Sequence, residues 1–281
     1  HKLSYYNVRA HEGLMRNVVI RCNGKGEFMV IVVINEENDL VRNVMIPELQ
    51  KRFPEIISIM LVINNKFNDI ITDLPFENVY GEECLIETMK APREGHDDLK
   101  FRVGPVSFFQ TNVYQGERLY KAAFDLADVQ GDELMYDLYT GTGTIALYFA
   151  RFVKNVVGVE YVEEAIADAK INSEFNNINN VKFYAGDMAK VFTDEFIEAN
   201  GRPDLVVTDP PRAGMHEKVV EQLLKIQPKK IVYISCNPAT QARDLQLLDS
   251  SYEVKAVQPV DMFPHTHHVE NIVLLELKIE N

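Results

Sequence analysis

The 281-residue chain has few cysteines, an excess of acidic over basic side chains and no long apolar run, and each of these shortages excludes something. Three cysteines, Cys22, Cys84 and Cys236, are too few and too scattered for a disulfide framework, so a reducing cytoplasm is the simplest compartment. No apolar run reaches the ~18 residues that a membrane-spanning helix needs, so we expect no membrane partner. The first residues show no basic segment followed by an apolar one, so no signal peptide is visible.

Basic side chains are outnumbered, with 29 Lys and Arg against 42 Asp and Glu, which gives a formal net charge of −13. Because phosphates are held chiefly by Lys and Arg, this balance argues mildly against a nucleic-acid partner, although a local basic patch is enough for one. Hydrophobic residues at 46% and charged residues at 25% are ordinary for a globular protein. The length suits one large domain or two ordinary ones.

The pattern of predicted elements changes near residue 106. Up to that point it predicts an antiparallel α+β domain with strands at 17–23, 27–35, 56–63, 79–89 and 99–106, and a helix over 39–53 that Pro47 breaks or restarts. Beyond it, strands and helices alternate, which predicts a parallel, doubly wound α/β sheet with ligands at the carboxyl ends of its strands. We therefore expect two domains, 1–106 and 107–281.

The second domain is predicted to open with an amphipathic helix over 112–127. Its strands are expected at 134–138, 156–160, 181–185, 205–208, 231–235, 252–257 and 272–279. Helices fit between them at 144–152, 163–175, 188–199, 218–226 and 238–248.

Three successive strands carry a carboxylate at or near their ends, namely Asp137, Glu160 and Asp187. The first is followed by a loop with Gly141 and Gly143, where the backbone can turn tightly and approach a ligand ahead of a helix N-terminus. The loop has neither the dinucleotide spacing GxGxxG nor the Gly-Lys-Ser/Thr of a phosphate loop. The acids would accept hydrogen bonds from ribose hydroxyls and an adenine amino group, with solvated loop acids as the alternative. This order resembles that of class I S-adenosylmethionine-dependent methyltransferases, with their Rossmann-like fold.

Three later loops have more specific sequences: Asp209-Pro210-Pro211-Arg212, Ser235-Cys236-Asn237-Pro238, and the segment 265–270, which reads His-Thr-His-His-Val-Glu. Together with Phe108-Phe109-Gln110-Thr111-Asn112, they resemble the RNA uracil-5-methyltransferase family, which makes 5-methyluridine in tRNA or large-subunit ribosomal RNA. The resemblance covers roughly residues 107–281. It implies S-adenosyl-L-methionine as cofactor and RNA as partner, with ribosomal RNA favoured and tRNA as the alternative.

The chemistry of uracil explains why a cysteine and a base are needed. C5 is a poor nucleophile until a thiolate adds to C6, and a base must afterwards remove the C5 proton so that the thiol can leave. Cys236 fits the nucleophile, because it ends a strand just before a helix N-terminus that is expected to lower its pKa. The resemblance implies Glu270 as the base. Asp209 would bond the N3–H of the ring or lie close to the cofactor.

The resemblance also implies which residues line the cofactor site, and the glycine loop adds to them: Gln110, Tyr139, Gly141, Gly143, Thr144, Glu160, Asp187 and Asp209. The histidines at 265, 267 and 268 match no familiar zinc spacing, so we expect no metal and give this loop a structural or RNA-contacting role. Some family members hold an iron–sulfur cluster on four cysteines, which we do not expect with three. Phe108, Phe109, Phe263 or the histidines would stack on a displaced base or its neighbours.

Two other functions stay open at this point. Asp-Pro-Pro-Arg also resembles the Asp/Asn-Pro-Pro-aromatic loop of methyltransferases that act on exocyclic amines, but those need no cysteine, and Arg212 replaces their aromatic residue. A non-catalytic RNA-binding module is disfavoured because nucleophile, base and cofactor acids are all present. Residues 1–106 do not clearly resemble the family's small β-barrel domain and the chain starts at His1, so we expect a truncated N-terminus. A cytoplasmic monomer is the default expectation.

Overall fold

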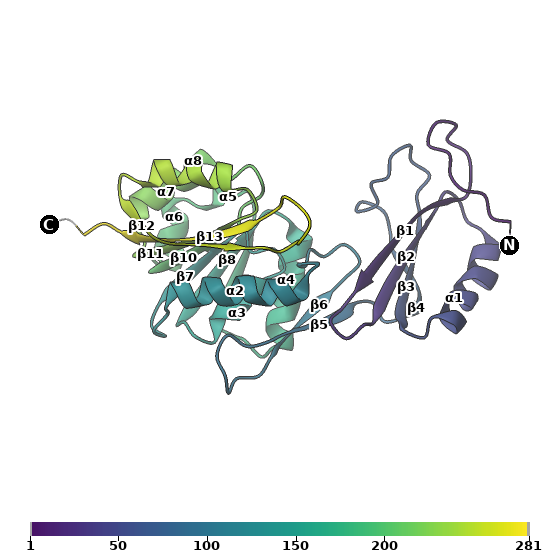
Figure 1. The fold of residues 1–281 in the computed structure, drawn as a ribbon, viewed down its shortest axis with the longest axis horizontal. Coiled ribbons are helices and arrows are strands. Elements are labelled where there is room, and N and C mark those ends of the chain that lie inside the picture. Colours follow the sequence, from purple (N-terminus) through teal and green to yellow (C-terminus); the bar gives the residue numbers. More distant parts are fainter. Residues whose placement is uncertain (1, 280–281) are drawn as a thin grey trace. The chain divides into compact units, whose positions relative to one another are not determined.

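The computed structural model describes residues 2–279, which divide into two compact units (Figure 1). The first unit runs to Glu87 and also takes in Arg102–Ser107, and the second comprises Thr88–Phe101 and the chain from Phe108 onward. In the described part of the chain, every helix is too short or too polar to cross a membrane.

The first unit is a four-stranded sheet with one helical crossover. Its strands, in the order β1-β2-β3-β4, are β1 (Met15–Cys22), β2 (Phe28–Ile34), β3 (Ile56–Ile63) and β4 (Glu77–Gly81). Strands β2 and β3 are parallel, so the predicted antiparallel pattern is wrong for this pair. The reason is the crossover, a π-helical turn η1 (Val41–Met45) followed by α1 (Ile46–Arg52), which is long enough to return the chain to the same end of the sheet.

Two local features of this unit follow from single residues. Pro47 lies in the first turn of α1, where a missing N–H costs nothing, so it restarts a helix after the π-helical turn. Gly81 has a φ of +72°, and a Cβ there would lie 2.0 Å from the Ile57 carbonyl oxygen, so the chain ends β4 at this glycine. The strand predicted over 79–89 is therefore two strands, β4 and β5 (Leu85–Met89).

Arg21 of β1 ties the last segment of the first unit to its sheet. The half-buried guanidinium donates to the carbonyl oxygens of Gly104 at 2.9 Å, Pro105 at 3.0 Å and Ser107 at 2.6 Å. Burial lowers the pKa of Arg21. Because three backbone acceptors converge on one cation, this segment has a fixed path along the sheet.

Strand β5 pairs with β6 (Leu99–Val103), and the chain between them packs in the second unit. The rings of Phe101 and Phe109 lie 5.7 Å apart between centroids. The Asn176 side chain accepts from the Lys100 backbone N–H at 2.8 Å and donates to the Lys100 carbonyl at 2.7 Å. The contacts therefore assign residues 88–101 to the second unit, whereas the sequence analysis predicted that the first domain extends without interruption to residue 106. These partners lie up to 76 residues away, where no local pattern can reveal them.

The second unit is built on a seven-stranded sheet with the strand order β12-β13-β11-β10-β7-β8-β9. Its strands are β7 (Leu134–Leu138), β8 (Asn155–Glu160), β9 (Val181–Ala185), β10 (Leu205–Thr208), β11 (Lys230–Ser235), β12 (Tyr252–Val260) and β13 (Glu270–Leu277). All neighbours are parallel except that β13 is antiparallel to both β11 and β12, which corrects the expected all-parallel sheet. The strand order reverses between β7 and β10, where open α/β sheets bind ligands.

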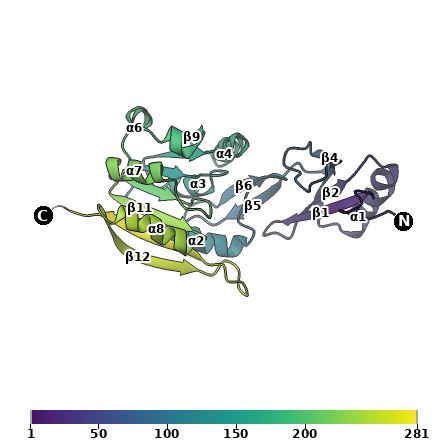
Figure 2. The ribbon, with the colours of Figure 1, turned by 90° about the horizontal axis from the view of Figure 1, so that it is seen from above.

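Helices cover both faces of this sheet, as Figures 1 and 2 show. One face carries α2 (Val113–Ala127), α3 (Thr144–Ala150) and α4 (Glu163–Phe175), and the other carries α5 (Met188–Val191), α6 (Asp194–Asn200), α7 (Glu217–Ile226) and α8 (Pro238–Leu248). The helix predicted over 188–199 is two helices, because the Thr193 hydroxyl accepts from the Phe196 N–H and starts a new one.

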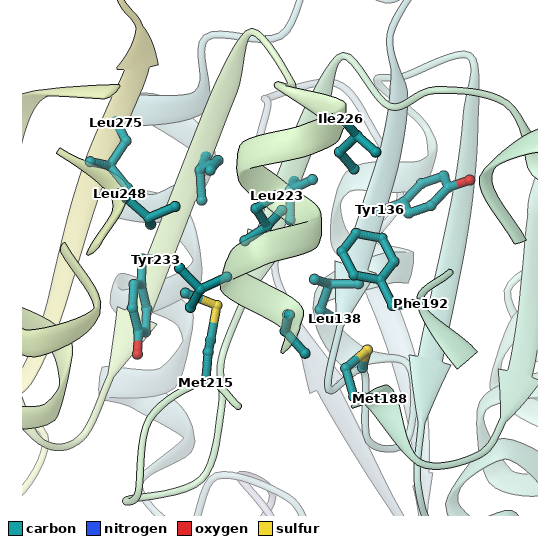
Figure 3. Close-up of a cluster of buried hydrophobic side chains, with 14 of the residues drawn as sticks. Tyr136, Leu138, Met188, Phe192, Met215, Leu223, Ile226, Tyr233, Leu248 and Leu275 are labelled. Atoms are coloured by element: carbon teal, nitrogen blue, oxygen red, sulfur yellow. The ribbon is translucent and has the colours of Figure 1, made fainter. Parts of the chain in front are cut away.

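The core beneath α7 holds the central strands in place (Figure 3). Val219, Val220, Leu223 and Ile226 recur at helical spacing and bury one face of α7 against the sheet. Leu223 is fully buried in the middle of this cluster. This packing fixes β7, β10 and β11, whose carboxyl ends carry the residues considered next.

We expect Leu223→Ala to lower the free energy of unfolding by about 2–5 kcal/mol, because the lost side chain leaves a cavity among fully buried neighbours. Urea denaturation measures the change. The matched control is Leu247→Ala on α8, where the leucine is 46% exposed and the cost should be well under ~1 kcal/mol. Equal losses in the two variants would contradict this description of the core.

Candidate active site

The loop between β7 and α3 depends on two glycines with different environments. Gly143 has a φ of +81°, and a Cβ there would lie 3.0 Å from the Ala169 Cβ and from the Phe183 ring. Gly141 has a φ of +55°, but nothing lies within 4 Å of where its Cβ would be. Packing therefore requires Gly143, whereas Gly141 leaves a stretch of backbone open to a ligand. Tyr139, with a φ of +66°, begins this turn.

Of the three strand-end acids, Asp137 faces inward and the other two stay accessible. Asp137 is fully buried and accepts from the Thr140 hydroxyl at 2.5 Å, and burial raises the pKa of its carboxyl to about 7. Glu160 is partly exposed and accepts from the backbone N–H groups of Gly141 and Val162, each at 3.1 Å. Asp187, also partly exposed, accepts from the Ala189 N–H at 3.0 Å. Asp137 therefore supports the loop, and Glu160 and Asp187 face solvent beside it.

Thr144 and Gln110, the remaining predicted cofactor residues, lie in different surroundings. The Thr144 hydroxyl is buried 3.4 Å from that of Thr142, inside the first turn of α3. The Gln110 side chain hydrogen-bonds the buried phenol of Tyr120 on α2, which sequence reasoning missed. Burial and the nearby charge of Asp209 raise the pKa of this phenol far above its usual value. Gln110 therefore reaches toward the chemistry residues.

The three predicted chemistry residues converge at one edge of the sheet. Asp209 follows β10, Cys236 follows the neighbouring β11, and Glu270 begins β13. Ser235 pairs with Asn271 in the antiparallel register between β11 and β13, so one further step brings Cys236 opposite Glu270. Since β13 runs against its neighbours, its first residue meets their last ones.

Burial raises the pKa of both carboxyls of this group. Burial, and then the charges of Glu270 and Asp137, raise the pKa of Asp209 to about 8. Burial also raises the pKa of Glu270, and the charge of Arg212 opposes this shift. At neutral pH the site therefore holds Asp209 protonated.

The pKa of the Cys236 thiol is raised, not lowered as the sequence suggested. Burial is the largest cause and the charge of Glu270 the next. The Asn237 side chain caps α8 by accepting from the Ala239 N–H at 3.2 Å. What lowers the pKa of Cys236 is a hydrogen bond with Arg212.

Arg212 is a candidate site residue that sequence reasoning undervalued. Its carbonyl oxygen accepts from Asn237 Nδ2 at 3.0 Å and from the Thr240 hydroxyl at 3.1 Å. Its Nη2 lies 3.1 Å from Nδ1 of His268, two residues before Glu270. Arg212 thus joins all three chemistry loops. The signal was present in Asp-Pro-Pro-Arg, but the sequence analysis read that arginine only as a missing aromatic residue.

The remaining histidines of segment 265–270 do not make a metal site in the structure. The rings of His267 and His268 lie with centroids 4.2 Å apart and are tilted by 37°, and His265 is exposed with a φ of +73°. Within residues 2–279, no group of three or more His, Cys, Asp or Glu is arranged to hold a metal ion.

Comparison with known proteins identifies the family. The profile of the tRNA (uracil-5-)-methyltransferase family matches residues 90–278. This chain belongs to that family. Uncharacterized RNA methyltransferases from Bacteroides thetaiotaomicron and Porphyromonas gingivalis are 54% and 51% identical, over 99% and 96% of this chain and 60% and 57% of their own lengths. The chain thus spans about three fifths of these relatives.

Solved structures agree on the fold. The tRNA (uracil-54, C5)-methyltransferase of Pyrococcus abyssi, solved in complex with S-adenosyl-L-homocysteine, is 35% identical with a TM-score of 0.79, over 98% of this chain and 63% of that one. The tRNA m1G37 methyltransferase of M. jannaschii has a TM-score of 0.58 at 14% identity, over 97% and 75% of the two chains, which is a likeness of fold alone. The predicted class I methyltransferase α/β fold is confirmed.

We expect Asp209→Asn to stabilise the protein increasingly as pH rises. An unfolded aspartate has a pKa near ~4, whereas the folded pKa is about 8. The contribution of Asp209 to stability is therefore full below pH ~4 and is lost as the pH rises through about 8. Asparagine does not titrate, so the gain over the parent protein should grow between pH 4 and 8 and then level off.

Urea midpoints across this pH range measure the effect. The matched control is Asp261→Asn, which alters an exposed aspartate in the loop after β12. A gain of equal size and pH dependence in the control would show that Asp209 is not its source.

Proposed function

We propose that this chain is the catalytic part of an S-adenosyl-L-methionine-dependent enzyme that methylates C5 of uracil in RNA. The observation that carries the proposal is the convergence of a cysteine, two carboxyls and an arginine at the ligand-binding edge of a class I methyltransferase sheet. A methyltransferase for exocyclic amines has no use for Cys236 or for a cation held against it, so the uracil reaction accounts for more of the site.

The loops after β7, β8 and β9 suit the cofactor. Gly141 has free space where a Cβ would be, so its backbone can approach a ligand closely. Glu160 and Asp187 are partly exposed acceptors at the next two strand ends, suited to ribose hydroxyls and an adenine amino group. Tyr139, Gly143 and Thr144 would shape the wall of this site, with Gln110 and Asp209 between cofactor and base. S-adenosyl-L-methionine would supply an electrophilic methyl group there.

Cys236 and Glu270 divide the reaction between them. The Cys236 thiolate forms an Sγ–C6 bond, and the ring electrons move toward O4, which makes C5 nucleophilic. After C5 has taken the methyl group, Glu270 removes the C5 proton, the ring double bond returns and the Sγ–C6 bond breaks. The raised pKa of Glu270 suits a base that must hold a proton for part of the cycle.

Asp209 is proposed to stabilise the charge that develops on the ring. With a pKa of about 8 it is protonated at neutral pH, so it donates a hydrogen bond to a uracil carbonyl. This changes the expected role, in which it accepted from N3–H. As negative charge builds on the ring oxygen, a donor already in place strengthens its contact without rearranging.

RNA is the proposed partner, and the experiment below uses both ribosomal RNA and tRNA as substrates. The loop sequences resemble a family that acts on both, and the relative from P. abyssi is named for tRNA. Among the aromatic residues expected to stack on bases, Phe108 is 69% exposed and free to do so. Phe109 is 8% exposed and packs on Phe101, so we assign it to the core.

The test uses transcripts that carry 5-fluorouridine, incubated with protein and S-adenosyl-L-methionine and resolved on a denaturing gel. Fluorine at C5 cannot leave as a proton, so the reaction should stop as a covalent protein–RNA adduct. Cys236→Ala should abolish the adduct and reduce transfer to native RNA by at least ~1,000-fold while cofactor affinity stays within about twofold.

Cys22→Ala, at an exposed cysteine of β1, is the matched control and should keep full adduct yield. An adduct that persists in Cys236→Ala would refute the covalent role of Cys236. No adduct with either RNA, followed by none with the longer B. thetaiotaomicron relative, would overturn the uracil reaction itself.

Glu270→Gln should form the adduct with unmodified uridine, accept the methyl group and then stall, because the C5 proton has no base. A denaturing gel with radiolabelled methyl groups should show label held in a protein–RNA band. Glu276→Gln, at the far end of the same strand, serves as control and should release methylated RNA normally. Normal release from Glu270→Gln would exclude Glu270 as the base.

A further inference from the structure

Among the histidines of segment 265–270, His268 is the one that the structure brings onto an active-site side chain. Arg212 Nη2 lies 3.1 Å from His268 Nδ1 and 3.5 Å from its Nε2. A guanidinium only donates hydrogen bonds, so the imidazole must accept with an unprotonated nitrogen. The contact therefore requires neutral His268.

Arg212 needs such a partner to keep its guanidinium in place. Its backbone is fixed, because its carbonyl oxygen accepts from Asn237 and Thr240. Its side chain is exposed, and a long arginine side chain without a partner samples many rotamers. The guanidinium also bonds the Cys236 thiol, where it lowers the pKa that burial and Glu270 raise. What holds Arg212 there consequently controls how much thiolate forms.

We propose that His268 positions the Arg212 guanidinium against the Cys236 thiol, and does so only while its imidazole is neutral. His268 is then a positioning residue that acts through Arg212. Its importance for methyl transfer rests on the proposed function, but its effect on the thiol does not.

The charges around His268 favour the neutral form. Burial and the charges of His267 and Arg212 all lower the pKa of His268. Glu270 faces Arg212 and Cys236 from β13, and Asp209, in the loop after β10, adds a negative charge near the thiol once it ionises at pH above about 8. Above the pKa of His268 the contact forms. Below it, an imidazolium repels the guanidinium and the thiol loses its cation.

Alkylation of Cys236 by iodoacetamide tests this without RNA or cofactor. Rates are read peptide by peptide by mass spectrometry between pH 5.5 and 9, with Cys22 as an internal standard. Only the thiolate reacts, and one unit of pKa changes its amount about tenfold below the pKa. We expect His268→Ala to slow alkylation of Cys236 by about 3–10-fold at pH 7.5 and to leave Cys22 unchanged.

His268→Asn separates hydrogen bonding from titration, because the amide oxygen can accept near the position of Nδ1 but takes up no proton. It should keep the rate within about twofold at pH 7.5. Its rate should fall tenfold per pH unit on the acid side, whereas the parent protein should fall more steeply as His268 protonates. His265→Asn is the matched control, since asparagine tolerates the positive φ at that exposed position, and it should match the parent throughout.

Arg212→Ala provides the second arm. In that background His268→Ala should slow alkylation no further, because its target is gone. An unchanged Cys236 rate in His268→Ala would overturn the proposal, as would equal losses in His268→Ala and His268→Asn or full additivity with Arg212→Ala. Melting curves show whether His268→Ala is misfolded. If it is, the pH dependence of Cys236 alkylation in His268→Asn tests the proposal instead. A missing 5-fluorouridine adduct in the parent protein counts against the proposed function alone.

Discussion

The site depends on the pairing of one antiparallel strand with a parallel sheet. Strand β13 runs against β11, and its register sets Asn271 opposite Ser235. That register brings Asn271 beside Ser235, the residue that ends a parallel strand 36 positions earlier. A slip by one residue would turn every side chain of β13, including Glu270, to the opposite face of the sheet. Residues 272–275 are all buried, so packing on both faces of the sheet holds β13 in the register that places Glu270 beside Cys236.

Much of the second unit could be predicted from the sequence, because each strand there is a short apolar run that ends in a polar loop. Asp209 and Cys236 lie directly after the strands where that reasoning placed them, whereas Glu270, expected in the loop before a strand at 272–279, begins β13 itself. The direction of β13 could not be predicted, since its apolar run reads the same parallel or antiparallel. The parallel pairing of β2 with β3 could not be predicted for a related reason. Local periodicity identifies a strand but does not show which strand it pairs with or in which direction.

The electrostatics of the site were the least predictable part. A helix start after Cys236 suggested a lowered pKa, yet the shift depends on burial and on Glu270, whose position follows from the fold. Burying Asp209 and Asp137 costs stability at neutral pH, because both carboxyls are kept from ionising fully. Strongly shifted pKa values of this kind are typical of functional sites, and here Arg212 is the cation that Cys236 and Glu270 share.

The path of residues 88–107 bears on how the protein is made. The first unit is interrupted in the chain, since Thr88–Phe101 belong to the second unit and Arg102–Ser107 return to the first. The family profile begins at residue 90, within this excursion. The three carbonyl groups that accept hydrogen bonds from Arg21 belong to Gly104, Pro105 and Ser107. The ribosome must therefore synthesise the chain past the interruption before the Arg21 guanidinium can form these hydrogen bonds. During synthesis, the first unit therefore lacks the partners of Arg21 while residues 88–101 of the second unit are already being made. The folding of the first unit is completed only after part of the second unit has been synthesised.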